Sequence, residues 1–164
     1  MKSAKQLISD LSLEAHPEGG FYTRIYESSN TINTTNGSRH SATAIHYLLE
    51  EGDFSSWHRI AYDEIWFFHS GVPLTVHQIS ASGKLTSTVL SHEHNISLTV
   101  NGRTWFCSEP LITPDKQSIE DPYSLVSCVV TPGFDFADFE MGNAEELVNL
   151  YPQHRDIICR LCRE

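Results

Sequence analysis

Residues 52–71 read Gly52-Asp-Phe-Ser-Ser-Trp-His58-Arg-Ile60-Ala-Tyr-Asp-Glu64-Ile-Trp66-Phe-Phe68-His-Ser-Gly71, and this stretch decides the fold. Side chains alternate between the two faces of a β-strand, so every second residue lies on the same face. In the first half of this stretch one face carries Phe54, Ser56, His58 and Ile60, and in the second half one face carries Glu64, Trp66 and Phe68. A turn near Ala61 predicts a β-hairpin in which His58 and Glu64 are cross-strand neighbours. An imidazole and a carboxylate among aromatic rings indicate a ligand site.

Short β patterns continue on both sides of this stretch, separated by glycine-containing turns. They predict strands at residues 21–27, 42–49, 54–60, 64–70, 74–80, 85–90, 95–100, 104–107 and 124–131. Residues 28–38 and 110–123 are polar and predict loops, the first of them exposed and mobile. Ser3 and Asn143 can cap short helices near the two ends, and a further short helix is expected from Gln153. The pattern predicts an all-β sandwich or barrel.

Composition narrows the class of protein. At 164 residues and 40% hydrophobic, the chain fits one domain over residues 1–164. A formal net charge of −10 leaves no basic face for nucleic acid, and no apolar run approaches the length of a membrane span. The N-terminal Met-Lys-Ser-Ala-Lys-Gln lacks the apolar core of a secretion signal, so we expect a cytoplasmic protein whose four cysteines stay reduced.

The spacing of Gly52, His58, Ile60, Glu64 and Gly71 resembles the first motif of the cupins. That resemblance implies a double-stranded β-helix, or jelly roll, in which two His and one Glu of this motif join a His of a second motif on a divalent metal. Here Ile60 stands at the second His position, and the second motif resembles residues 100–106 with Trp105 at its His position. Neither side chain offers a lone pair to a metal. We therefore expect no metal cofactor; if a divalent metal binds, His58 and Glu64 are its expected ligands.

Four separated blocks resemble a narrower group, the cupin five family, whose members form a domain of unknown function. They are His16-Pro-Glu-Gly-Gly-Phe-Tyr22, Phe54-Ser-Ser-Trp-His58-Arg, Asp63-Glu-Ile-Trp66 and Pro132-Gly-Phe-Asp-Phe-Ala-Asp-Phe-Glu140. The resemblance covers about residues 5–152 and implies a small jelly roll that forms a homodimer. The sequence departs from the pattern of this family at two positions near the expected site. Thr23 separates the aromatic pair from Arg24, and Asn101 stands where a proline commonly precedes the glycine.

The candidate catalytic residues are His58 and Glu64, because a carboxylate partner fixes the tautomer of an imidazole and raises its basicity. The alternative for Glu64 is an ion pair with Arg59 or Arg39, since a buried carboxylate needs a partner. The expected ligand-binding residues form the walls around this pair: Tyr22, Arg24, Ser56, Ile60, Trp66, Phe68 and Trp105.

These residues predict a small organic ligand, sugar- or nucleotide-like compounds included, and acid–base chemistry of the isomerase or epimerase type without a metal. Two alternatives stay open: a metal-dependent cupin oxygenase or isomerase, and a binding module without catalysis. The sequence does not separate the first hypothesis from the last, and it names neither substrate nor reaction.

Overall fold

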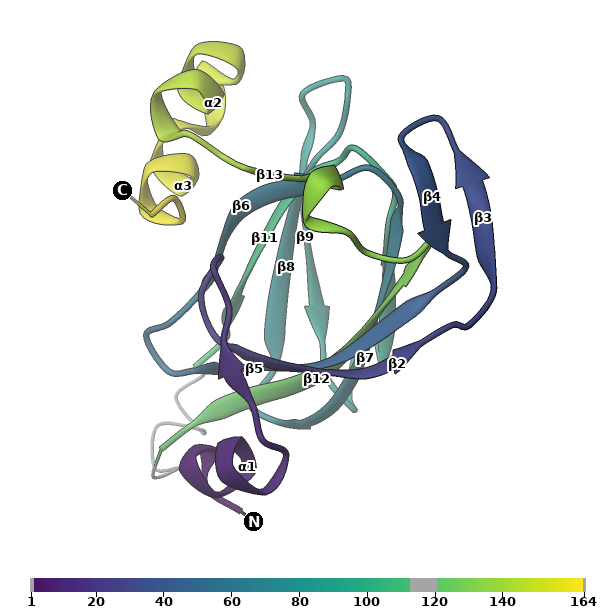
Figure 1. Ribbon diagram of the computed structural model, residues 1–164. Coiled ribbons are helices and arrows are strands. Elements are labelled where there is room, and N and C mark those ends of the chain that lie inside the picture. Colours follow the sequence, from purple (N-terminus) through teal and green to yellow (C-terminus); the bar gives the residue numbers. More distant parts are fainter. Residues whose placement is uncertain (1, 113–120, 164) are drawn as a thin grey trace.

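The computed structural model describes residues 2–112 and 121–163. Two antiparallel sheets face each other and enclose the core (Figure 1). The six-stranded sheet has the order β1-β2-β5-β12-β7-β10, with bounds Glu14–Ala15, Phe21–Glu27, Thr43–Glu50, Tyr123–Thr131, Asp63–Gly71 and Ser97–Val100. The five-stranded sheet has the order β13-β6-β11-β8-β9, with bounds Phe139–Met141, Ser55–Ile60, Trp105–Pro110, Leu74–Ile79 and Leu85–Leu90. The predicted all-β class is confirmed.

In the described part of the chain, three short α-helices lie outside the sheets: α1 (Ala4–Asp10), α2 (Ala144–Leu150) and α3 (Arg155–Arg160). Ser3 caps α1 in a full capping box with Gln6, and Asn143 accepts the backbone N–H of Glu146 at the start of α2, as the sequence predicts. Helices α2 and α3 cover the outer side of β6 and β11, where Trp57 and Trp105 of these strands pack with apolar side chains of the helices. Within the described ranges, none of the helices has the length and apolarity needed to cross a bilayer.

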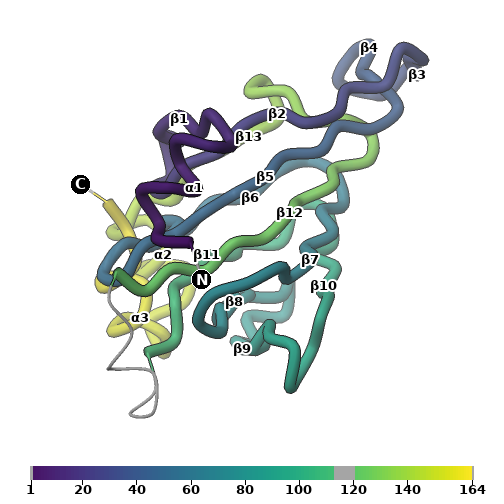
Figure 2. The backbone as a smooth tube through the Cα atoms, turned by 90° about the horizontal axis from the view of Figure 1, so that it is seen from below, coloured from purple at the N-terminus to yellow at the C-terminus, as the bar shows by residue number. Residues whose placement is uncertain are grey.

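Residues 28–38 do not form the predicted loop. They contain most of a two-stranded hairpin, β3 (Thr31–Thr34) and β4 (Gly37–His40), which projects from the end of the molecule opposite the helices (Figure 2). Its strands are polar and exposed, so composition alone suggested a loop. The Asn36-Gly37 pair, with Gly37 at φ +105°, is the turn signal that favoured a hairpin. Of the predicted loop over residues 110–123, residues 113–120 lie outside the described residues.

The predicted hairpin of residues 52–71 is also wrong. Strand β6 pairs with β11 and β13 in one sheet, whereas β7 pairs with β12 and β10 in the other. The chain therefore crosses between the sheets at Ala61 and Tyr62. His58 and Glu64 are not cross-strand neighbours, although each faces the interior from its own sheet.

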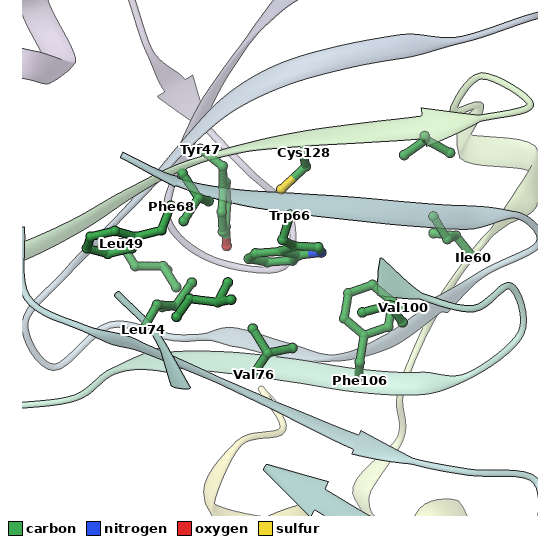
Figure 3. Packing of buried hydrophobic residues seen from close by; sticks show 13 residues of the cluster. Tyr47, Leu49, Ile60, Trp66, Phe68, Leu74, Val76, Val100, Phe106 and Cys128 are labelled. Carbon is green, nitrogen blue, oxygen red and sulfur yellow. The ribbon is translucent and has the colours of Figure 1, made fainter. Parts of the chain in front are cut away.

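A packed core fills the space between the sheets (Figure 3). Tyr47, Trp66 and Cys128 of the six-stranded sheet face Val76 and Phe106 of the five-stranded sheet. Trp66 and Phe106 meet edge to face, with ring centroids 6.2 Å apart. This packing fixes the inner faces of β7 and β11, on which the neighbouring cavity is built.

The glycines that bound residues 52–71 offer a matched test of this packing. Both have positive φ, +79° at Gly52 and +99° at Gly71, but a Cβ at Gly52 meets open space whereas one at Gly71 overlaps the carbonyl of Tyr123 on β12. We predict that Gly52→Ala costs roughly 1 kcal/mol for its backbone conformation alone, and that Gly71→Ala costs about 3 kcal/mol or more. Urea unfolding of both variants measures the difference; equal losses would contradict the close approach of Gly71 to β12.

Candidate functional site

A small cavity opens between the two sheets beside the core, with a volume of about 50 Å³ available to the centres of water-sized spheres. Its charged and histidine side chains come from four parts of the chain: His16 and Glu18 before β2, Arg24 on β2, His58 on β6 and Glu64 on β7. Aromatic rings form much of the remaining wall: Tyr22, Tyr47, Trp66, Phe134, Phe136 and Phe139. A few convergent polar groups in an apolar cavity are typical of a small-molecule site.

Glu18 is the carboxylate at the centre of this group, and it is only 7% exposed. Its Oε1 accepts a hydrogen bond from the Ser55 hydroxyl at 3.0 Å, and its Oε2 lies 3.1 Å from Nε2 of His58. The same Oε2 lies 3.6 Å from Nδ1 of His16. The contacts with Ser55 and His58 offset the cost of burying the carboxylate.

The hydrogen bonds of His58 define its protonation. Its Nδ1 lies 2.7 Å from the carbonyl oxygen of Ser56, which can only accept, so Nδ1 carries a proton. The contact between Nε2 and the Glu18 carboxyl therefore requires a second proton, which the two groups share. Glu18 and His58 form a buried pair with no net charge, either as carboxylate and imidazolium or as two neutral groups.

Glu64 faces the same cavity from the opposite sheet and is 8% exposed. Burial raises the pKa of its carboxyl to about 8, and the Glu18 carboxylate adds to the rise, while the nearby Trp66 indole and Cys128 thiol oppose it. Glu64 therefore keeps its proton at neutral pH. The Trp66 indole N–H, although close, reaches hydrogen-bond geometry with no group among the described residues.

Most of the chain matches a known protein family. Residues 5–142 match the family model Cupin_5, described as Cupin superfamily (DUF985). The chain belongs to this family. The search of curated proteins found no match.

Two solved structures are similar over nearly the whole chain. A protein from Shewanella oneidensis is 36% identical with a TM-score of 0.87, covering 99% of both chains. A hypothetical protein from Leishmania major is 32% identical with a TM-score of 0.90, covering 99% of this chain and 100% of that one. At 11% identity, an oxalate decarboxylase mutant from Bacillus subtilis shares the fold, with a TM-score of 0.56 over 91% of this chain and 37% of that one. The predicted cupin double-stranded β-helix is thus confirmed.

The predicted hairpin paired His58 with Glu64, but the structure gives His58 a different partner, Glu18. Both of its ring nitrogens are engaged, by Ser56 and by Glu18. Glu64 is not in an ion pair with either suggested arginine, because Arg59 binds Glu140 and Arg39 binds Asp138. His58 and Glu64 share one cavity from opposite sheets without bonding to each other.

Four of the predicted wall residues line the cavity: Tyr22, Arg24, Ile60 and Trp66. Arg24 lines the cavity near its mouth, where its side chain is 38% exposed and pairs with Glu27. The intervening Thr23 thus does not turn Arg24 away from the cavity.

Three predicted wall residues lie elsewhere. His58 of β6 pairs with Phe106 of β11, and Ser55 pairs with Ser108. Between these two pairs β6 advances by three residues and β11 by only two, so β6 contains a β-bulge. This bulge reverses the alternation, turning Ser55 toward Glu18 while the Ser56 hydroxyl bonds to Leu161. Phe68 packs in the core, and Trp105 packs under α2 and α3.

The sequence did not single out Glu18 and His16 as site residues. Both lie in the block of residues 16–22 that carried the family resemblance, but in a turn where no strand periodicity assigns a face. The two consecutive glycines, Gly19 and Gly20, were the available sequence signal for an unusual turn at this point. Gly19 and Gly20 both have positive φ, and this turn directs Glu18 inward.

A cupin metal does not fit the residues present. Ile60 occupies the second ligand position of the motif and lines the cavity with a hydrocarbon side chain. Phe106, rather than Trp105, faces the interior and packs on His58 with ring centroids 4.1 Å apart. Over residues 2–112 and 121–163, no group of three or more His, Cys, Asp or Glu side chains is arranged to hold an ion. The donor set at His58 is engaged by protein groups.

The raised pKa of Glu64 predicts a pH-dependent stability. The folded protein holds the Glu64 proton up to about pH 8, whereas an unfolded chain releases it near 4.5, so stability falls as pH rises between these values. Glu64→Gln removes this loss. We predict that the free energy of unfolding of Glu64→Gln gains roughly 3 to 4 kcal/mol on the wild type between pH 5 and pH 8, measured by urea unfolding. A constant difference across that range would show that Glu64 is ionised throughout.

Proposed function

We propose that this cupin binds a small carbonyl compound in the cavity and moves a proton at the carbon next to the carbonyl, as an isomerase or epimerase does, without a metal. The observation that supports this proposal is the presence of two carboxyl groups in one cavity with different proton partners. Glu18 is bonded by Ser55 and His58, whereas Glu64 holds its own proton. Two carboxyl groups in such different environments take the roles of base and acid.

Glu18 is the proposed base. With His58 as imidazolium, Glu18 is a carboxylate whose lone pairs are only partly used by Ser55 and His58. When Glu18 accepts a proton from the ligand, the imidazolium remains beside the enolate and offsets its charge. Glu64 is the proposed acid, because it is protonated at neutral pH and faces the same cavity.

The walls indicate the size and kind of ligand. Trp66, Tyr22 and the three phenylalanines offer flat apolar surfaces, and Arg24 near the mouth offers a cation for an acidic substituent. Keto acids carry such an acidic substituent, and small sugars can pack against the flat aromatic walls. A non-catalytic binding module is the second candidate, favoured by the same apolar walls, and it differs from the first in leaving its ligand unchanged.

Hydrogen exchange at carbon tests the proposal directly. We predict that the protein, incubated in D₂O with a panel of aldoses, ketoses and 2-keto acids, incorporates deuterium next to the carbonyl of at least one compound, as followed by proton NMR. Glu18→Gln and His58→Ala should lower the rate at least about 10²-fold because the base is lost or disordered.

Glu140→Gln is the matched control, since Glu140 is an exposed carboxylate that pairs with Arg59 on the outer side of β6. It should exchange at the wild-type rate. Exchange that survives Glu18→Gln, or no exchange with any compound of the panel, would reject the catalytic proposal. A compound that binds to the protein but shows no deuterium exchange would favour the binding module.

We also propose a homodimer, as the family resemblance implies. The outer side of the six-stranded sheet exposes Phe67, 40% accessible, next to the imidazole of His69. Size-exclusion chromatography with light scattering should give twice the mass of 18.5 kDa at micromolar concentration. A monomer at that concentration would refute the dimer.

A further inference from the structure

His16 is the second histidine at the Glu18 carboxylate, and its hydrogen bonds are the reverse of those of His58. Its Nδ1 accepts the backbone N–H of Glu18 at 3.3 Å, so Nδ1 has no proton. A ring with an unprotonated Nδ1 carries its proton on Nε2. The two imidazoles beside one carboxylate oxygen therefore differ: His58 is protonated at Nδ1, and His16 at Nε2.

The surroundings of His16 keep its ring neutral and fixed in place. Its side chain is 7% exposed, and burial lowers its pKa against the opposing effect of Glu18, with His58 adding to the decrease. Tyr22 packs edge to face on the ring with centroids 4.6 Å apart, and Phe139 lies against it at 6.4 Å. The imidazole is held between aromatic walls of the cavity.

The Nε2–H group of His16 has no hydrogen-bond partner in the described part of the chain, while the residue lines the cavity. A neutral imidazole that donates from a fixed position is a strong ligand for a carbonyl oxygen that becomes negatively charged, because it stabilises the charge without itself losing a proton.

We propose that His16 is a catalytic hydrogen-bond donor, whose Nε2–H binds the carbonyl oxygen of the ligand and stabilises the enolate formed next to Glu18. This assignment rests on the proposed function and names its substrate class, a carbonyl compound with a hydrogen on the neighbouring carbon. The C–H bond breaks and its proton passes to Glu18. The C–H electron pair forms the C=C bond, and the π pair of the carbonyl moves to the oxygen held by His16. Return of a proton to the same carbon from Glu18 gives back the compound, and return from Glu64 in the opposite sheet inverts that carbon; exchange with water then removes the proton from Glu18 and replaces that of Glu64, so no oxidant or cofactor is needed.

Two substitutions separate this role from a purely structural one. The side-chain oxygen of Asn at position 16 can accept the backbone N–H of Glu18 two residues on, as Nδ1 does, but the side chain is too short to reach the position of Nε2. Gln is long enough to place an N–H near that position. If His16 is a donor, His16→Asn should lower kcat for deuterium exchange about 10²-fold with little change in KM, and His16→Gln should stay within about tenfold of the wild type.

A tautomer measurement complements the kinetics. In protein with ¹⁵N-labelled histidine, long-range proton–nitrogen NMR spectra at neutral pH should show His16 neutral with its proton on Nε2, and the loss of its signals in His16→Asn identifies them. Wild-type exchange in His16→Asn, or a His16 proton on Nδ1, would overturn the assignment of His16 while leaving Glu18 as the base. No exchange by the wild type overturns the proposed function and this donor role together.

Discussion

The buried carboxylate of Glu18 joins parts of the chain that are far apart in sequence. Its side chain meets Ser55 and His58 on β6, and its backbone carbonyl accepts the N–H of Ser56 at 2.8 Å and the Nε–H of Arg163 at 3.1 Å. The next residue, Gly19, accepts the hydroxyl of Tyr47 on β5 at 2.7 Å. A buried charge without these bonds would cost several kcal/mol. The turn before β2, both sheets and the C-terminal segment are therefore held together at the same point that carries the proposed chemistry.

Much of the fold could be predicted from the sequence because strand periodicity and capping are local signals. Residues 21–27 and 85–90 form β2 and β9 with the predicted bounds, and the other predicted strands agree to within three residues at each end. Pairing is not local. A turn at Ala61 is compatible both with a hairpin and with a crossing between sheets, and the choice depends on β11 and β12, about 50 to 70 residues later. The stretch 52–71 therefore had the right strands and the wrong pairing.

The candidate site was predictable to the same extent. His58 and Glu64 could be placed in the interior because an imidazole and a carboxylate occur in phase with aromatic residues. Ser56 was placed with them by strict alternation, which the bulge in β6 interrupts. No pattern in the sequence signals such a bulge, since it is set by the pairing with β11. Glu18 lies in a turn with no period at all, and only the contacts of the folded chain show that its carboxylate faces His58.

The charge balance of the cavity explains how a cupin fold can accommodate these acids without the usual ligand set. In the cupin resemblance, a divalent ion would offset the carboxylate of the motif. Here Ile60 and Phe106 remove donors, and protons offset the charge instead: one shared by Glu18 and His58, one on Glu64. With a neutral His16, the buried acids and imidazoles of the cavity carry no net charge, which is the least costly state for buried groups; Arg24 at the mouth is paired with Glu27. Because the compensating charges are protons, the groups that make the cavity stable are the same groups that could exchange a proton with a ligand, and both properties should depend on pH together.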